Sequence, residues 1–205
     1  MLQRGTVKNR NALIIIAKYP ETGFVKTRLN GFMTDKKILE LYTYLLEQTI
    51  HKLRAIPGVD SYIAYIPEHA EDYFSQFRTG LVRLSGDDLG LNMSHSFEVI
   101  FKKGYQKAVL VGADIPDLSA SIVLHAFALM SDNDLVYGPA EDGGYYLVGM
   151  KKLITEVFDN VPWSSDKTLS KSLEEAKKAG YTVGYTKTLE DIDTIEDVEK
   201  TGFSV

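Results

Sequence analysis

Short apolar runs alternate with longer, mixed stretches along the chain. The apolar runs predict strands at residues 13–17, 61–66, 81–84, 108–113, 134–138, 145–150 and 181–186. The intervening stretches predict helices near residues 35–55, 68–77, 92–104, 120–130, 166–179 and 195–201. Because strands alternate with helices throughout, the pattern is typical of an α/β domain with a mainly parallel sheet. No internal repeat, low-complexity tract or linker interrupts this pattern, so we expect residues 1–205 to form one domain.

Residues that favour helix ends stand at several of these boundaries. Thr34, Ser119 and Ser165 each precede a predicted helix, and their hydroxyl groups can accept a hydrogen bond from its first turn. Gly180 follows the helix predicted at residues 166–179 and is expected to end it, because glycine readily adopts the left-handed conformation found there.

Composition narrows the class of protein. The chain has 205 residues, 44% hydrophobic and 25% charged, which is ordinary for a globular protein with a substantial core. Its 23 basic and 28 acidic residues give a net charge of −5, which does not favour binding to nucleic acid or anionic membranes. The absence of cysteine excludes disulfides, thiolate zinc sites and cysteine nucleophiles. We expect a cytoplasmic protein, since this composition fits a reducing compartment.

The beginning of the chain has basic residues before an apolar run, as a signal peptide does. The run extends only over residues 12–17, and Lys18 and Pro20 interrupt it without a small-residue cleavage site. We interpret it as a buried strand. No stretch approaches the ~18 apolar residues of a membrane span.

Ligands of open α/β sheets bind beyond the carboxyl ends of the strands, which directs attention to residues 18–28, 112–117 and 138–144. The first of these loops contains a glycine and then a Lys-Thr pair. It is not a P-loop, because two residues separate Gly23 from Lys26. Lys18, Lys26 and Arg28 can nevertheless hold a diphosphate or triphosphate. A solvated loop with ordinary surface charges fits this segment equally well.

The second loop contains an aspartate directly after a buried strand. Only Gly112 and Ala113 separate Asp114 from the apolar run, and such a position is unusual for a surface charge. Its carboxylate could bind a hard divalent cation, which takes oxygen ligands and bridges phosphates. The alternative is a turn or cap aspartate, which is common.

The third loop is Asp142-Gly143-Gly144, between two predicted strands. It is either a simple hairpin turn or a place where a substrate approaches the backbone beside Asp142. Five residues in AEDGG are too many for a two-residue hairpin, which favours a functional loop.

A dense acidic segment lies near the end of the chain. LEDIDTIEDV can supply helix caps through Asp193 or Thr194, or it can complete a metal site; the sequence pattern alone favours the caps. Trp163 is interpreted as a packing residue at a helix start, with pocket lining as the alternative. The four histidines are scattered, and the chain has neither a G-x-S-x-G nor a G-x-G-x-x-G motif.

Together these segments resemble a bacterial family assigned as glycosyltransferases of the nucleotide-diphospho-sugar transferase superfamily. The family was once grouped as a domain of unknown function, and some members are named for a role in arsenosugar biosynthesis. The resemblance covers almost the whole chain, through ALIIIAKYPETGFVKTRL, SGDDLGLNM, VLVGADIPDL, YGPAEDGGYYLVGM, VPWSSDKTL and LEDIDTIEDV.

The resemblance implies a GT-A-like fold, which is a Rossmann-like α/β/α sandwich with a mainly parallel central sheet. In such folds the loop after the first strand wraps the nucleotide phosphates, a role that falls here on Lys18, Gly23, Lys26 and Arg28. These proteins commonly bind Mg²⁺ or Mn²⁺ through an aspartate after the central strand.

The same resemblance assigns further roles by position. It implies that Asp114 and Asp193 are the metal ligands, which moves Asp193 from cap towards ligand. It places Asp142, Gly143 and Gly144 at the acceptor or sugar side. The segment 88–90, with Asp88 and Gly90, would then lie near the base.

Two departures from the family pattern are present. Many relatives carry a charged pair after the Asp-Leu-Gly segment, where this chain has Leu91 and Asn92. The chain also lacks an obvious D-x-D motif. A lone Asp114 followed by Ile-Pro is more like the nucleotidyltransferase branch.

Three functions follow as hypotheses. The first is a metal-dependent glycosyltransferase with a nucleotide-diphospho-sugar donor and a small-molecule acceptor. In it Lys26 and Arg28 offset the charge of the departing diphosphate, and Asp142 is the general base. The second is a nucleotidyltransferase that uses a nucleoside triphosphate and releases pyrophosphate. The third is a non-catalytic nucleotide-binding module.

Overall fold

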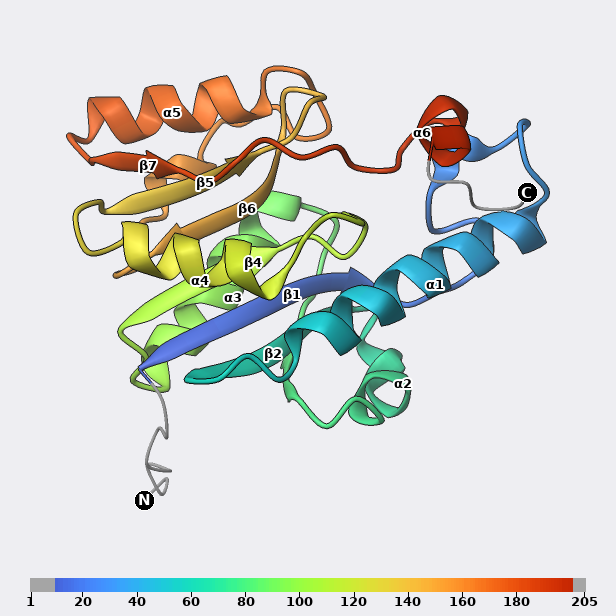
Figure 1. Ribbon diagram of the computed structural model, residues 1–205, viewed down its shortest axis with the longest axis horizontal. Coiled ribbons are helices and arrows are strands. Elements are labelled where there is room, and N and C mark those ends of the chain that lie inside the picture. The colour runs from blue at the N-terminus through green and yellow to red at the C-terminus, as the bar shows by residue number, and fades with distance from the viewer. Residues whose placement is uncertain (1–9, 201–205) are drawn as a thin grey trace.

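A seven-stranded sheet forms the centre of the computed structural model, which describes residues 10–200 (Figure 1). Its strand order is β3-β2-β1-β4-β6-β5-β7. The strands are β1 (Asn11–Lys18), β2 (Val59–Ile66), β3 (Gly80–Arg83), β4 (Lys107–Val111), β5 (Leu135–Pro139), β6 (Tyr145–Met150) and β7 (Val183–Tyr185). Each apolar run of the sequence therefore becomes a strand, and all seven strands join one sheet.

Helices connect most of the strands. The α-helices are α1 (Asp35–Leu53), α2 (Glu71–Ser75), α3 (Leu89–Lys102), α4 (Ala120–Leu129), α5 (Thr168–Lys178) and α6 (Ile195–Lys200). Short 3-10 helices are η1 (Thr27–Leu29), η2 (Glu68–Ala70) and η3 (Glu156–Phe158). Among these helices, none has the length and apolar character needed to cross a bilayer.

Two of the predicted helix starts are wrong. The helix expected from residue 92 begins earlier, at Leu89, because the side chain of Asp88 caps it by accepting from the Leu91 N–H (2.8 Å). The helix expected from residue 166 begins at Thr168 instead. Ser165 belongs to a preceding turn, in which its carbonyl accepts from the Thr168 N–H (3.1 Å).

The predicted caps and stops have mixed outcomes. Thr34 accepts a hydrogen bond from the Lys37 N–H (3.4 Å) and so caps α1, as expected. Ser119 occupies the cap position of α4, but its hydroxyl pairs with that of Ser121 (2.8 Å) and makes no cap bond. Gly180 has φ +77°, the left-handed conformation expected after α5.

The sheet is mainly parallel but contains one reversed strand. β1 pairs in parallel with β2 and β4, β2 with β3, and β5 with β7, whereas β6 is antiparallel to both β4 and β5. Because β6 is reversed, its first residue lies at the edge where the parallel strands end. The loop between β5 and β6 therefore reaches the same edge as the loops after β1 and β4.

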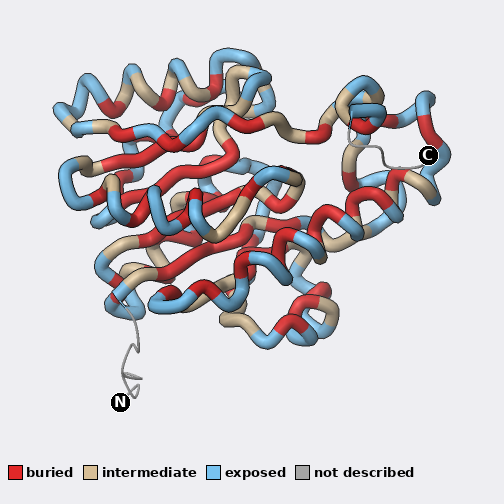
Figure 2. Tube along the Cα trace, viewed as in Figure 1, coloured by how far each residue is buried: buried red, intermediate tan, exposed pale blue. Residues whose placement is uncertain are grey.

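Helices cover both faces of the sheet, and β1 contributes to both cores. Leu13 and Ile15 belong to the core beneath α1 and α4, whereas Ala12 and Ile14 belong to the core beneath α3 and α5. Figure 2 shows the buried stretches concentrated in the strands and on the inner faces of the helices. This two-sided burial explains why the first strand is a continuous apolar run rather than an alternating one.

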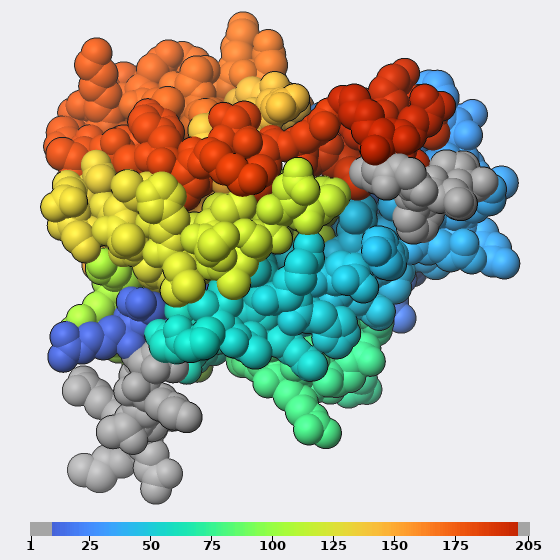
Figure 3. All heavy atoms as spheres, viewed as in Figure 1, coloured from blue at the N-terminus to red at the C-terminus, as the bar shows by residue number. Residues whose placement is uncertain are grey.

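A third, smaller core lies apart from the sheet. Figure 1 shows α6 beside the first turns of α1, and in Figure 3 the late red part of the chain crosses the molecule to meet the blue early part. The buried residues of this satellite core are Leu29, Met33, Ile38, Leu41, Leu45, Ile192 and Val198. It joins the segment after β1 to the end of the described chain, and both segments carry charged side chains of the site described next.

Candidate functional site

A cavity of about 890 Å³ opens at the carboxyl edge of the sheet. The chain turns from β1 to β2 on one side and reaches β4 on the other, so this edge includes a topological switch point, where open α/β sheets bind ligands. The predicted site residues that line the cavity are Lys18, Lys26, Arg28, Asp88, Asp114, Asp142, Gly144 and Asp193. The three predicted loops therefore converge here, together with the segments that carry Asp88 and Asp193.

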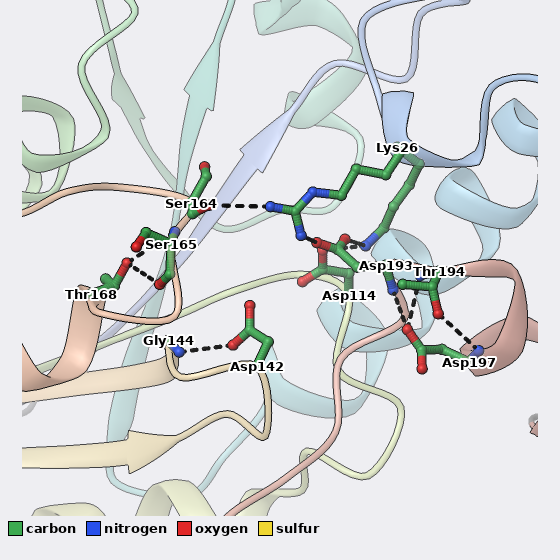
Figure 4. A network of polar contacts seen from close by, with 11 residues as sticks. Lys26, Asp114, Asp142, Gly144, Ser164, Ser165, Thr168, Asp193, Thr194 and Asp197 are labelled. Atoms are coloured by element: carbon green, nitrogen blue, oxygen red, sulfur yellow. Dashed lines mark hydrogen bonds and ion pairs between the residues drawn. The ribbon is translucent and has the colours of Figure 1, made fainter.

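Lys26 forms the centre of the site. Its Nζ lies 2.7 Å from Oδ2 of Asp114 and 2.8 Å from Oδ1 of Asp193, and its side chain is only 3% exposed (Figure 4). Burial lowers the pKa of Lys26, but the two carboxylates outweigh this effect and the net pKa is raised above its ordinary value. The ammonium group therefore remains charged and neutralises two carboxylates, one from the middle of the chain and one from near its end.

The backbone of Lys26 is strained. It has φ 46° and ψ 42°, in the left-handed region that is uncommon for a residue with a side chain and costs on the order of 1–3 kcal/mol. Lys26 is the cap residue of η1, and the buried side chain of Leu29 anchors this helix in the satellite core. The local fold thus holds Lys26 in a conformation that it does not favour by itself.

Arg28 connects two walls of the cavity. Its Nη1 donates to Oδ2 of Asp193 (2.8 Å), and its Nη2 donates to the carbonyl oxygen of Ser164 (3.3 Å). Ser164 also has a left-handed backbone, with φ 60°. Arg28 is half exposed, so its remaining donors face the cavity and can meet an anion.

The structure distinguishes the two expected roles of Asp193. Thr194, not Asp193, caps α6: its Oγ1 accepts from the Asp197 N–H (3.3 Å), and Oδ2 of Asp197 accepts in return from the Thr194 N–H (2.8 Å). The same Asp197 oxygen accepts from the Asp193 N–H (3.1 Å). The backbone of Asp193 is thus fixed by the cap, while its side chain points away to Lys26 and Arg28.

Asp114 and Asp193 form a donor set that suits a hard cation. Both direct carboxylate oxygens at the same position, which the ammonium group of Lys26 occupies. Within residues 10–200, no group of three or more His, Cys, Asp or Glu side chains is arranged to hold a metal ion. Two carboxylates still fit Mg²⁺, because this ion keeps several waters and is commonly bound by one or two carboxylates together with substrate phosphates.

A further carboxylate, Asp191, was not among the predicted site residues. It lines the same cavity, and burial, together with the negative charges of Asp142, Asp193 and Asp114, raises its pKa to about 6. Two of these neighbours come from other loops. The alternation in Asp191-Ile192-Asp193 is a sequence signal for this carboxylate. In an extended segment it places both aspartates on one side, while Ile192 packs into the satellite core.

The Asp142 loop combines a turn with an exposed carboxylate. Oδ1 of Asp142 accepts from the Gly144 N–H (2.8 Å), and the Ala140 N–H donates to the Gly144 carbonyl (3.0 Å). Gly143 has φ +88°, and a β-carbon there would lie 2.2 Å from the carbonyl oxygen of Asp166. Gly143 is thus required by close backbone packing and does not line the cavity, whereas Asp142 and Gly144 do.

The other two predicted glycines also serve the backbone. Gly23 has φ +82° and turns the loop after β1, with open space around it. Gly90 lies in α3 against the indole of Trp163. Neither lines the cavity, but Asp88 and Trp163 do. Both interpretations of Trp163 therefore hold, because it packs on Gly90 and also forms part of the wall.

Comparisons with known proteins agree on the family. Residues 49–165 match the family described as "Uncharacterized protein conserved in bacteria (DUF2064)". A crystal structure of a "putative nucleotide-diphospho-sugar transferase" from Desulfovibrio desulfuricans G20 is 30% identical, with a TM-score of 0.87 over 94% of this chain and 86% of that one. No curated protein matches this chain.

More distant structures share the fold. CMP:2-keto-3-deoxy-manno-octonic acid synthetase in complex with CTP is 14% identical, with a TM-score of 0.58 over 93% of this chain and 96% of that one. The 4-diphosphocytidyl-2C-methyl-D-erythritol synthase of Anaerococcus prevotii DSM 20548 is 13% identical, with a TM-score of 0.63 over 94% of both chains. The predicted nucleotide-diphospho-sugar transferase fold is therefore confirmed.

Proposed function

Since the chain belongs to the DUF2064 family, and since its charged residues meet at the switch point of a nucleotide-diphospho-sugar transferase fold, we propose that it is a glycosyltransferase. Its donor is a nucleotide-diphospho-sugar, its acceptor is a small molecule, and a bound divalent cation assists the reaction. The convergence of Lys26, Arg28, Asp114 and Asp193 at one point carries this proposal, because it provides both the positive and the negative groups that a metal-diphosphate needs.

The charged residues divide into two functions. Asp114 and Asp193 would hold Mg²⁺ or Mn²⁺, which, when bound, neutralises negative charge on the diphosphate. Arg28 offers its exposed guanidinium donors to phosphate oxygens, while its bond to Ser164 fixes the direction of the fork. Lys18 lines the same cavity and adds a further positive charge. These groups stabilise the diphosphate as the bond to the sugar breaks.

Asp142 is the candidate general base. Its Oδ1 accepts from the Gly144 N–H, whereas no hydrogen bond among the described residues reaches Oδ2, which can accept a proton. In the proposed reaction the acceptor oxygen attacks the anomeric carbon, and the bond from that carbon to the diphosphate oxygen breaks. The nucleoside diphosphate leaves, and the acceptor proton passes to Asp142.

Nucleotidyl transfer is the second candidate. It is favoured by the likeness to a synthetase whose structure contains CTP, and by the single aspartate after β4 in place of a D-x-D motif. The same side chains would then hold a nucleoside triphosphate. Attack on its α-phosphate would release pyrophosphate.

One assay separates these candidates. The protein is incubated with Mn²⁺ or Mg²⁺ and a panel of nucleotide sugars and nucleoside triphosphates, and the released products are separated by chromatography. We expect nucleoside diphosphate from a nucleotide sugar. Pyrophosphate released from a triphosphate, with no turnover of any nucleotide sugar, would contradict glycosyl transfer. Nucleotide binding without turnover of either class would indicate the non-catalytic module.

A further inference from the structure

We propose that Lys26 is a resident cation: its ammonium group occupies the metal position while the site is empty, and a divalent cation displaces it toward the phosphates. This inference rests on the proposed function. It assigns Lys26 two successive partners, first the two carboxylates and then the phosphates of the ligand. It begins from the contacts of Nζ, which lies at almost equal distances from Asp114 (2.7 Å) and Asp193 (2.8 Å).

The ammonium group performs a structural task in the ligand-free site. Asp114 and Asp193 come from two segments that meet where the Ile192 N–H donates to the Asp114 carbonyl (3.5 Å). Without a cation between the two carboxylates, their negative charges would repel each other at short range. Lys26 reaches this point from a third segment, the loop after β1, and is almost completely enclosed there. It thus holds the two carboxylates of the proposed metal site close together and neutralises them before any metal is present.

A divalent cation cannot share this position with Lys26. It would have to contact the same two carboxylates, and a charge of +2 beside an ammonium group is strongly repulsive at such separations. Lysine carries its charge on a flexible four-carbon stem, so Nζ can leave while the backbone of Lys26 remains fixed at the start of η1. Arg28 contacts Asp193 and lines the same cavity. An ammonium group that leaves the two carboxylates would therefore stay beside this guanidinium, where both can bind the phosphates of a ligand.

Metal and phosphate binding are therefore coupled through Lys26. Binding of the metal alone breaks two partly buried ion pairs and leaves an ammonium group without a partner, which weakens metal affinity. A diphosphate restores a partner for that group, so each ligand increases the affinity for the other by the same factor. The site would then bind divalent cations weakly until phosphates arrive.

Chemical labelling of the wild-type protein tests the displacement directly. Reductive methylation followed by peptide mass spectrometry measures the reactivity of each lysine amine, and exposed Lys18 in the same cavity is the internal reference. We expect Lys26 to be protected in metal-free protein and to become at least about fivefold more reactive with saturating Mn²⁺. Lys26 that stays protected while Mn²⁺ is bound would overturn the proposal.

Binding measurements on two variants test the coupling. Mn²⁺ affinity is measured by titration calorimetry, with and without pyrophosphate as the probe, for wild type, Lys26→Met and Lys18→Met. Both variants lose one positive charge from the cavity. We expect Lys26→Met alone to bind Mn²⁺ about tenfold more tightly without pyrophosphate, and to lose most of the enhancement by pyrophosphate.

The outcomes remain distinct from those for the proposed function. Equal gains in Mn²⁺ affinity in both variants would mean that only the total charge of the cavity matters, which contradicts the inference. A lower Mn²⁺ affinity of Lys26→Met would contradict it as well. If Lys26→Met fails to fold, the labelling of wild type still decides. A protein that exposes Lys26 on binding Mn²⁺ but turns over no nucleotide sugar would contradict the glycosyltransferase and leave this inference standing.

Discussion

The indole ring of Trp163 lies directly on Gly90, so closely that a β-carbon at position 90 would be 2.6 Å from Cζ2 of the ring. The ring also meets Tyr145 edge-on, with their centroids 6.4 Å apart, and it contacts Phe158. It thus connects α3 to β6 along the wall of the cavity. The space that the indole occupies therefore explains why position 90 is a glycine, whereas the family resemblance implied only that the segment 88–90 lies near the base.

Gly90→Ala is expected to destabilise the protein by about 1–3 kcal/mol, because the indole must shift out of a packed position. In a Trp163→Ala background the clash is absent, and the same change is expected to stabilise α3 by about 0.5–1 kcal/mol through helix propensity. Urea denaturation of the four proteins measures both effects. An equal loss of stability in the two backgrounds would show that the indole is not the cause.

Asp142→Asn separates the two roles of that carboxylate. Asparagine can still accept from the Gly144 N–H but cannot take a proton from an acceptor hydroxyl. We expect kcat to fall by about 10²–10⁴-fold, with a change in the free energy of unfolding below about 0.5 kcal/mol. Glu141→Gln, in the same loop but outside the cavity lining, is the control. Full activity of Asp142→Asn would reduce Asp142 to a turn residue.

Thr194→Ala removes the hydroxyl cap of α6. The expected cost is about 0.5–2 kcal/mol, concentrated in this short helix. The Thr194 hydroxyl also positions Asp197, whose carboxylate accepts from the Asp193 N–H. Amides 193–198 should therefore exchange hydrogen faster, and the enhancement of Mn²⁺ binding by pyrophosphate should decrease. Thr194→Ser keeps the hydroxyl and should resemble wild type. Unchanged hydrogen exchange in Thr194→Ala would show that the Thr194 hydroxyl does not stabilise the backbone of Asp193.

Asp134 is expected to make the stability of the protein depend on pH. Its Oδ2 accepts from the backbone N–H (3.1 Å) and the hydroxyl (2.9 Å) of Thr182, which lowers the pKa of Asp134, with a smaller effect from Lys151. A lowered pKa contributes stability above the ordinary value of about 4, and this stability is lost as the pH falls through the folded-state pKa.

Asp134→Asn should therefore be less stable than wild type at pH 7, by about 1 kcal/mol or less. The difference should decrease as the pH falls below about 4 and through the lowered folded-state pKa of Asp134, because protonation removes the charge. Denaturation curves between pH 2.5 and 7 measure it. A difference that stays constant over this range would mean that the charge of Asp134 contributes nothing.

The order of the secondary structure was predictable because its signals are local. Buried runs such as residues 13–17 and 108–113 predict strands covered on both faces. Thr34 marks the start of α1 through its hydroxyl, and Gly180 marks the end of α5 through its left-handed backbone. Ser165 failed as a cap because the following turn holds its carbonyl and hydroxyl, a competition that the sequence does not reveal. The antiparallel pairing of β6 with β4 was likewise not predicted, since it depends on non-local pairing.

The candidate site was predictable in its members but not in its contacts. The three loops were found because strand ends in α/β sheets face ligands, and Asp114 stood out as a charge directly after a buried strand. The sequence pattern alone favoured Asp193 as a helix cap and left Lys26 open, and only the family resemblance assigned both to the site. The sequence could not reveal that Lys26 bridges the two aspartates, because its partners lie 88 and 167 positions away. Asp191 was seen only as part of an acidic run, since its pKa depends on carboxylates from other loops.

The separation of 167 positions between Lys26 and Asp193 also has a consequence for synthesis of the chain. A ribosome releases β1, its loop and Asp114 long before the residues that follow β7. During that interval Lys26 can meet only one of its carboxylates, and the satellite core lacks Ile192 and Val198. The sheet can begin to form while the chain is still growing, but we expect the charged centre to assemble last, when translation delivers the segment that α6 closes.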